Sequence, residues 1–155
     1  MDKRAKERVL IAKDALAWIE AGALIPAAGV YVLPEMSPSE EEVKDSNKQL
    51  RDVKLGKCDV CAKGCLFLAK AVRYDNVLAS QWCKTAEACW PGGVLEEHFD
   101  CDQLALIEYT FEGWDYDEQP LNEKANAFYY KYPDTKKRLV AILKNLIKHD
   151  GTFQL

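Results

Sequence analysis

The chain has 155 residues, 21 basic and 25 acidic side chains, a formal net charge of −4 and a sequence pI near 5.3. With 48% hydrophobic residues it has the composition of one ordinary soluble domain, long enough to bury a core without disulfides or structural metals. The acidic balance disfavours nucleic-acid binding by bulk charge, because phosphate binding draws on clustered Lys and Arg. No apolar run approaches the ~20 residues of a membrane-spanning helix. The charged residues 1–8 precede no signal-type apolar core, so we expect a reducing cytoplasm and no membrane partner.

The amino-terminal segment predicts one helix followed by an extended stretch. Residues 3–21 carry apolar side chains at helical spacing, and Gly22 closes the helix. The expected buried stripe is Val9, Ala12, Leu16 and Ile19, widened by Ile11, Ala15 and Trp18. Pro26 and Gly29 then interrupt the chain, and residues 30–33 (Val-Tyr-Val-Leu) favour a short extended arm or strand.

A second helix start follows at residues 37–42. A capping Ser, a Pro in the first turn and three glutamates are typical of a helix amino terminus. The continuation to Lys54 has only three apolar side chains to bury, which are Val43, Leu50 and Val53. We therefore expect residues 34–54 to form an exposed or mobile helical segment.

The middle of the chain predicts two consecutive helices. In residues 58–74 one helical face holds Cys58, Cys61, Cys65, Leu68 and Val72. After a turn at residues 75–76, residues 77–90 repeat the pattern with Leu78, Trp82, Ala86 and Cys89, and Pro91 stops the helix.

The last third predicts three more helical pieces. Asp100 is placed to cap a helix, with Gln103 reaching back and Phe99 packing on Leu104. A short piece at residues 123–132 and a closing helix at residues 134–149 follow. Together these elements predict a mainly α fold, with residues 1–155 as a single compact domain of about six helices and at most a short extended arm or small strand pair.

The cysteines allow three interpretations. Cys58, Cys61 and Cys65 continue a helical apolar stripe, so we favour buried, reduced core thiols without metal. The alternative is a zinc site of Cys58, Cys61, His98 and Cys101, because C-x-x-C and H-x-x-C supply four ligands. The third is a thiol-redox or nucleophilic role, in which a helix amino terminus lowers the pKa of Cys61.

A cysteine nucleophile needs a base, and the chain has two histidines, His98 and His149. His149 lies in the last turn of the closing helix, where the helix dipole favours an imidazole. His98 precedes a helix start and is expected in a surface loop. No spacing completes a Cys-His arrangement, so we assign no catalytic residue and no cofactor.

Charge is unevenly distributed along the chain. Residues 85–123, here called the acidic block, contain eleven acids and neither Lys nor Arg. The closing helix is basic, and Lys137, Lys144 and Lys148 share the face opposite its apolar stripe. The two segments either pair with each other within the fold or meet partners outside it. In the second case the expected partner-binding residues, for a partner with a basic surface, are Tyr109, Glu112, Trp114, Asp115, Tyr116 and Asp117. Lys137, Lys144 and Lys148 are then the candidate anion-binding residues.

Several blocks together suggest a relationship. They are R-V-L-I-A-K-D-A-L at residues 8–16, G-V-Y at 29–31, C-D-V-C-A-K-G-C-L-F at 58–67, Q-L-A-L-I-E at 103–108, F-E at 111–112 and N-L-I-K-H-D-G-T-F at 145–153. The sequence resembles a family of small uncharacterised proteins common in tailed-phage and prophage genomes. That family has a C-V-C-A-x-G block and a polar capping residue at the position of Cys101, which argues against the zinc alternative.

The resemblance implies a phage-type accessory protein acting in an infected bacterium. Our leading hypothesis is a non-catalytic protein that binds a host or phage macromolecule and modulates host defence or metabolism. The first alternative is a protein that binds a small, nucleotide-like molecule, in which Lys and Arg side chains of the closing helix bind the phosphate. The second alternative is a zinc- or thiol-dependent enzyme.

Overall fold

The computed structural model describes residues 2–36, 38–45, 47–75, 95–113 and 121–155. In chain order its elements are α1 (Lys3–Glu20), β1 (Leu24–Pro26), β2 (Val32–Pro34), α2 (Glu40–Lys44), a 3-10 turn (Leu50–Asp52), β3 (Cys58–Val60), α3 (Ala62–Tyr74), α6 (Cys101–Glu112), α7 (Leu121–Lys131) and α8 (Thr135–Lys148). The prediction of a mainly helical fold is confirmed. Among the described elements, five helices have 11 residues or more, against about six expected. The helix expected at residues 77–90 lies outside the described residues.

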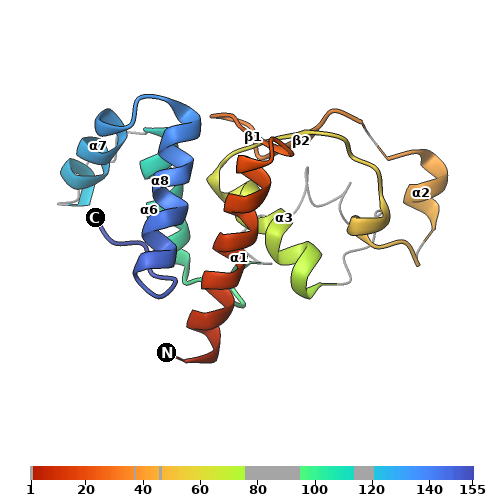
Figure 1. Ribbon diagram of the computed structural model, residues 1–155, viewed down its shortest axis with the longest axis horizontal. Coiled ribbons are helices and arrows are strands. Elements are labelled where there is room, and N and C mark those ends of the chain that lie inside the picture. The colour runs from red at the N-terminus through yellow and green to blue at the C-terminus, as the bar shows by residue number, and fades with distance from the viewer. Residues whose placement is uncertain (1, 37, 46, 76–94, 114–120) are drawn as a thin grey trace.

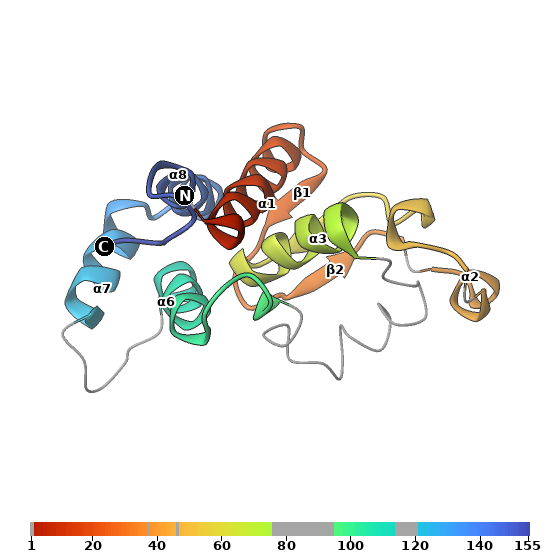
Figure 2. The same ribbon diagram turned by 90° about the horizontal axis from the view of Figure 1, so that it is seen from below.

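The long helices pack around one core. α1 lies between α8 and α3, and α6 contacts α3, α7 and α8 (Figures 1 and 2). A single hydrophobic cluster takes side chains from α1, the sheet, α3, α6 and α8, and from Leu95, Phe99 and Phe153. Within the described ranges, no helix is long and apolar enough to cross a membrane.

The helix α1 matches its predicted bounds, but its buried side is rotated. Asp2 caps it by accepting a 2.7 Å hydrogen bond from the Ala5 amide. The buried residues are Ala5, Ile11, Ala12, Ala15 and Ile19, whereas Val9 and Leu16 are half-buried. The cause is that α1 packs on two helices, so its buried face is centred between them.

Three short strands form a small sheet where we expected at most an arm or a strand pair. The order is β1-β3-β2, with β1 parallel and β2 antiparallel to β3. Leu24 pairs with Cys58 and Val32 with Val60, so the strand that joins the other two comes from the cysteine segment. Three-residue strands have no measurable periodicity, and their pairing is long-range, so the sequence pattern did not reveal them.

The predicted helix through residue 54 is wrong. α2 has five residues and ends at Lys44, with Asp45 as its C-cap. Its start is as expected, because Ser39 and Glu42 form a reciprocal capping box. Beyond it, Leu50 and Val53 are buried, which anchors this part of the segment to the core.

The helix predicted for residues 58–74 starts four residues late. Residues 58–60 form β3 and Cys61 is the N-cap of α3. Cys58 therefore points into the core from a strand, and not from a helix. From Ala62 to Ala71 every residue of α3 is buried, including Lys63 and Lys70.

The carboxyl-terminal helices agree closely with the sequence patterns. α6 follows Asp100 as expected, but without a side-chain cap, and Gln103 instead accepts a 2.8 Å hydrogen bond from the Phe153 amide. α8 starts after Asp134, whose carboxylate accepts from the Lys137 amide. After it, Gly151 adopts a left-handed conformation (φ +80°).

The stability of the fold should depend on α8. Leu143 and Leu146 are fully buried, so truncation of either to Ala should lower the free energy of unfolding by about 2–5 kcal/mol. Lys144→Ala, on the exposed side of the same helix, is the matched control and should change it by about 0.5 kcal/mol or less. Urea denaturation monitored by circular dichroism measures all three, and wild-type stability of both leucine variants would contradict this core.

Candidate functional site

A cluster of polar and titratable side chains lies where the loop before β2, the start of α3 and α6 meet. Its members are Tyr31, Cys61, Lys63, Glu108 and Glu112. The Cys61 amide donates a 3.3 Å hydrogen bond to the Tyr31 carbonyl. A Cβ on Gly64 would lie 1.7 Å from that carbonyl oxygen, so only glycine allows this approach. The cluster thus presses the loop onto the helix.

Charges in the cluster are paired internally. Lys63 Nζ forms an ion pair with Glu108 Oε2, and both side chains are largely buried. Glu112, one helical turn further on, accepts a 2.8 Å hydrogen bond from the Gly29 amide. Burial raises the pKa of Glu112 above its ordinary value, more than the Gly29 hydrogen bond lowers it. The two glutamates therefore hold α3 and the Gly29 loop against α6.

The Tyr31 hydroxyl is buried and has no hydrogen-bond partner among the described residues. Burial raises the pKa of Tyr31, with smaller contributions from Cys61 and Glu108. The phenol is therefore neutral at physiological pH. A neutral phenol next to a paired Lys offers no ionised base.

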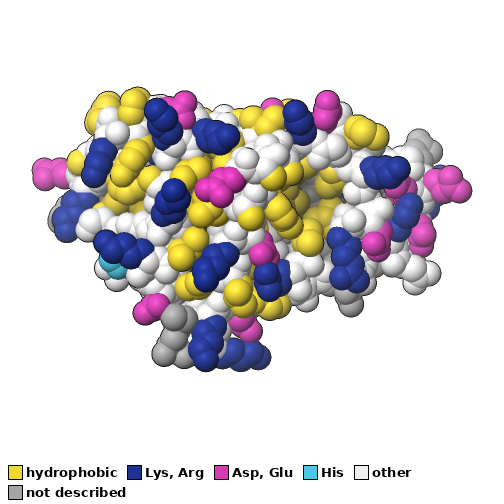
Figure 3. All heavy atoms as spheres, viewed as in Figure 1, with side chains coloured by type: hydrophobic (Ala, Val, Ile, Leu, Met, Phe, Trp, Pro, Cys, Tyr) yellow, Lys and Arg dark blue, Asp and Glu magenta, His cyan; other side chains and the backbone are white. Residues whose placement is uncertain are grey.

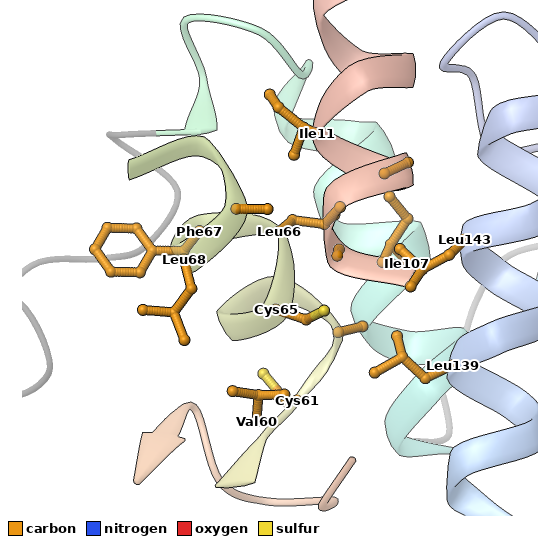
Figure 4. Close-up of a cluster of buried hydrophobic side chains, with 14 of the residues drawn as sticks. Ile11, Val60, Cys61, Cys65, Leu66, Phe67, Leu68, Ile107, Leu139 and Leu143 are labelled. Carbon is orange, nitrogen blue, oxygen red and sulfur yellow. The ribbon is translucent and has the colours of Figure 1, made fainter. Parts of the chain in front are cut away.

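The three neighbouring thiols are core residues. Cys58, Cys61 and Cys65 are all buried and free. Figure 4 shows Cys61 and Cys65 among Val60, Leu66 and Leu139. The Cys61 sulfur also caps α3, accepting from the Gly64 amide at 3.4 Å. The prediction that these thiols pack as apolar groups is confirmed.

The third interpretation of the cysteines, in which a helix amino terminus lowers the pKa of Cys61, does not hold. A helix amino terminus favours the thiolate, but burial outweighs it and raises the pKa of Cys61 to about 11. Burial also raises the pKa of Cys58 to about 11 and that of Cys65 further. All three thiols are thus protonated at neutral pH, which disfavours a nucleophilic role.

The four residues of the zinc alternative have separate surroundings. His98 is buried, and its Nδ1 lies 3.1 Å from Glu7 Oε2, which corrects our expectation of a surface loop. Cys101 is exposed, and its thiol donates to Glu96. In the described ranges, no group of three or more His, Cys, Asp or Glu side chains is placed to hold a metal ion.

Two further buried cations were missed by the sequence patterns. Lys70 forms ion pairs with Asp75 and Glu97 at 2.6 and 2.8 Å. Arg138 donates to the Phe111, Tyr132 and Pro133 carbonyls, and its guanidinium lies 4.1 Å from the Tyr129 ring centroid. The burial of Lys63 and Lys70 could have been predicted from the sequence. Apolar residues occur on every face of this helix, so no face is left for a solvent-exposed lysine.

The predicted partner-binding residues fall into two groups. Glu112 is half-buried and bonded to Gly29, and Tyr109 also has an interaction within the protein, so neither is a free docking side chain. Trp114, Asp115, Tyr116 and Asp117 lie outside the described residues. The candidate anion-binding residues Lys137, Lys144 and Lys148 are all exposed on α8.

Comparison of the chain with protein-family models, curated proteins and solved structures finds no match.

The raised pKa of Glu112 predicts a pH-dependent stability. A carboxyl whose pKa is higher in the folded than in the unfolded state destabilises the fold as pH rises through the two values. Glu112→Gln removes this penalty and keeps an acceptor for the Gly29 amide. The unfolding free energy of the variant, relative to wild type, should therefore increase between about pH 4 and pH 7. Glu41→Gln, at an exposed position, is the control, and a pH-independent difference for Glu112→Gln would contradict the assignment.

The thiols should react in order of exposure. Iodoacetamide at neutral pH should modify Cys101 before Cys58, Cys61 or Cys65, as measured by peptide mapping of the folded protein. Cys65→Ser places a hydroxyl in an apolar layer and should lower the unfolding free energy by about 1–3 kcal/mol. One equivalent of zinc in the purified protein, lost on Cys61→Ser, would overturn the core assignment.

Proposed function

We propose that the protein is a non-catalytic, phage-type accessory protein that binds a host or phage macromolecule in the bacterial cytoplasm. The main observation in support is that the thiols, buried lysines and buried histidine of the described part all make contacts that stabilise the fold. The three buried thiols are protonated, Lys63 and Lys70 are in ion pairs, and His98 faces Glu7. What such a chain offers to other molecules is its surface.

The first candidate surface is the acidic block. Its acids are interleaved with Trp114 and Tyr116, and aromatic side chains among carboxylates combine an anchor with electrostatic steering. Phe111 is buried in the core, and Tyr109 has an interaction within the protein. Within it, Glu108 and Glu112 serve the fold. The proposal therefore rests on Asp115 and Asp117 as the acids that meet a basic partner.

The test is affinity capture of the tagged protein from phage-infected cells, followed by binding of each captured partner in purified form. Asp115→Lys/Asp117→Lys reverses two charges and should reduce binding of the purified partner on the order of tenfold at low salt. The matched control is Glu41→Lys/Asp52→Lys, which makes the same charge change at exposed positions elsewhere. Equal binding by wild type and both variants, without salt dependence, would move the active surface elsewhere.

A further inference from the structure

The solvent side of the α1–α8 pair is a basic surface that the fold does not neutralise. Its cations are Lys6 and Lys13 on α1 and Lys137, Lys144 and Lys148 on α8, all of them exposed. In the described part of the chain, none has a carboxylate within ion-pair distance. We call these five lysines the basic face. Figure 3 shows Lys and Arg side chains spread over this side of the molecule, with some Asp and Glu side chains among them.

The two helices bring the lysines together. α1 and α8 pack side by side and antiparallel, and Arg8 near the start of α1 donates to the Gly151 carbonyl just beyond α8 (Figure 1). On each helix the lysines lie opposite the buried stripe, which holds Ile11 and Ile19 on α1 and Leu139 and Leu146 on α8. The fold therefore places exposed lysines of two segments, more than a hundred residues apart in sequence, on neighbouring helices.

In the described residues, the ion pairs of the acidic block run to α3, through Lys63–Glu108 and Lys70–Glu97. Glu112 also interacts electrostatically with Arg138 of α8, whereas none of the five exposed lysines takes part in a described ion pair. Arg4 and Arg8 also bond carbonyl groups within the protein. The lysines of the basic face are thus a surplus of positive charge in a chain whose net charge is −4.

Size and composition define the occupant. At about 1.5 Å per residue, Lys137 to Lys148 span roughly 16 Å, and packed helix axes lie about 8–10 Å apart. That area matches about three turns of one additional helix. One aliphatic side chain of α1 is also exposed, since Leu10 is 38% exposed.

Acids close both ends of the basic face. Glu20 and Asp134 lie at one end of the helix pair, and Asp2 and Asp150 at the other, all exposed. The phosphate backbone of a nucleic acid would extend past these carboxylates and be repelled by them. A short acidic helix fits between them. We propose that the basic face binds an acidic, amphipathic helix of a partner protein, with lysines on its carboxylates and Leu10 on its apolar side. This inference rests on the proposed function, that the protein acts by binding a macromolecule.

The test uses the full-length protein and a fluorescein-labelled helical peptide of about 18 residues, with Leu at helical spacing and Glu elsewhere. A second peptide with Gln in place of Glu and a DNA duplex of about 20 base pairs are compared by fluorescence anisotropy. The Glu peptide should bind on the order of tenfold more tightly than the Gln peptide, with affinity falling as salt rises.

The decisive variant is Lys137→Glu/Lys144→Glu, which should weaken binding of the Glu peptide on the order of tenfold. The matched control, Arg51→Glu/Lys54→Glu, makes the same charge change at exposed positions outside the helix pair and should bind within about twofold of wild type. Thermal melting of both variants checks that they are folded.

Four results would overturn the inference. They are no binding of the Glu peptide, equal weakening in both variants, tighter binding of DNA than of the peptide, and salt-sensitive self-association that the decisive variant abolishes. The last would make a second copy of the chain the occupant. If a partner captured from cells binds Lys137→Glu/Lys144→Glu as well as wild type, this inference fails while the proposed function stands. If the peptide binds as expected but no cellular partner is captured, the proposed function fails instead.

Discussion

The enclosure of α3 is the constraint on which the rest of the structure depends. A helix buried from Ala62 to Ala71 has no side open to water, so each polar group on it must find a partner inside the protein. Its amino terminus is capped by a thiol, and its two lysines are neutralised by carboxylates from other segments. Those requirements fix where α6 and residues 95–99 lie.

The same constraint explains why burial raises the pKa of the thiols in this cysteine-rich segment. Thiols at a helix amino terminus become nucleophilic when solvent and the helix dipole stabilise the thiolate. Here Cys61 lies at the amino terminus of α3 but is shielded from solvent, because Gly64 allows the Tyr31 carbonyl to cover the start of the helix. Desolvation then raises the pKa, and the sulfur serves as a capping acceptor.

Sequence patterns predicted α1, α6 and α8 well because each has a one-sided apolar stripe or a strong start signal, such as Asp134 before α8. They failed at residues 58–61. The spacing of the cysteines there also suits a helix, so the predicted helix included residues that form β3 and the N-cap of α3. Burial of the thiols was still predicted correctly, since the core surrounds both elements. The site was harder to foresee. Tyr31, Lys63 and Glu108 come from three distant segments, and the pairing of β2 with β3 brings the first two together.

The distribution of charge follows from these packing choices. A buried lysine without a counterion would cost several kcal/mol, so α3 recruits carboxylates from the acidic block. Each carboxylate used in this way is unavailable to α8, whose exposed lysines cost nothing to the fold because water solvates them. Internal neutralisation on one side of the molecule thus leaves uncompensated charge on the other. In a chain of net charge −4, a positive surface bounded by acids would give orientation as well as attraction to the acidic partner proposed above.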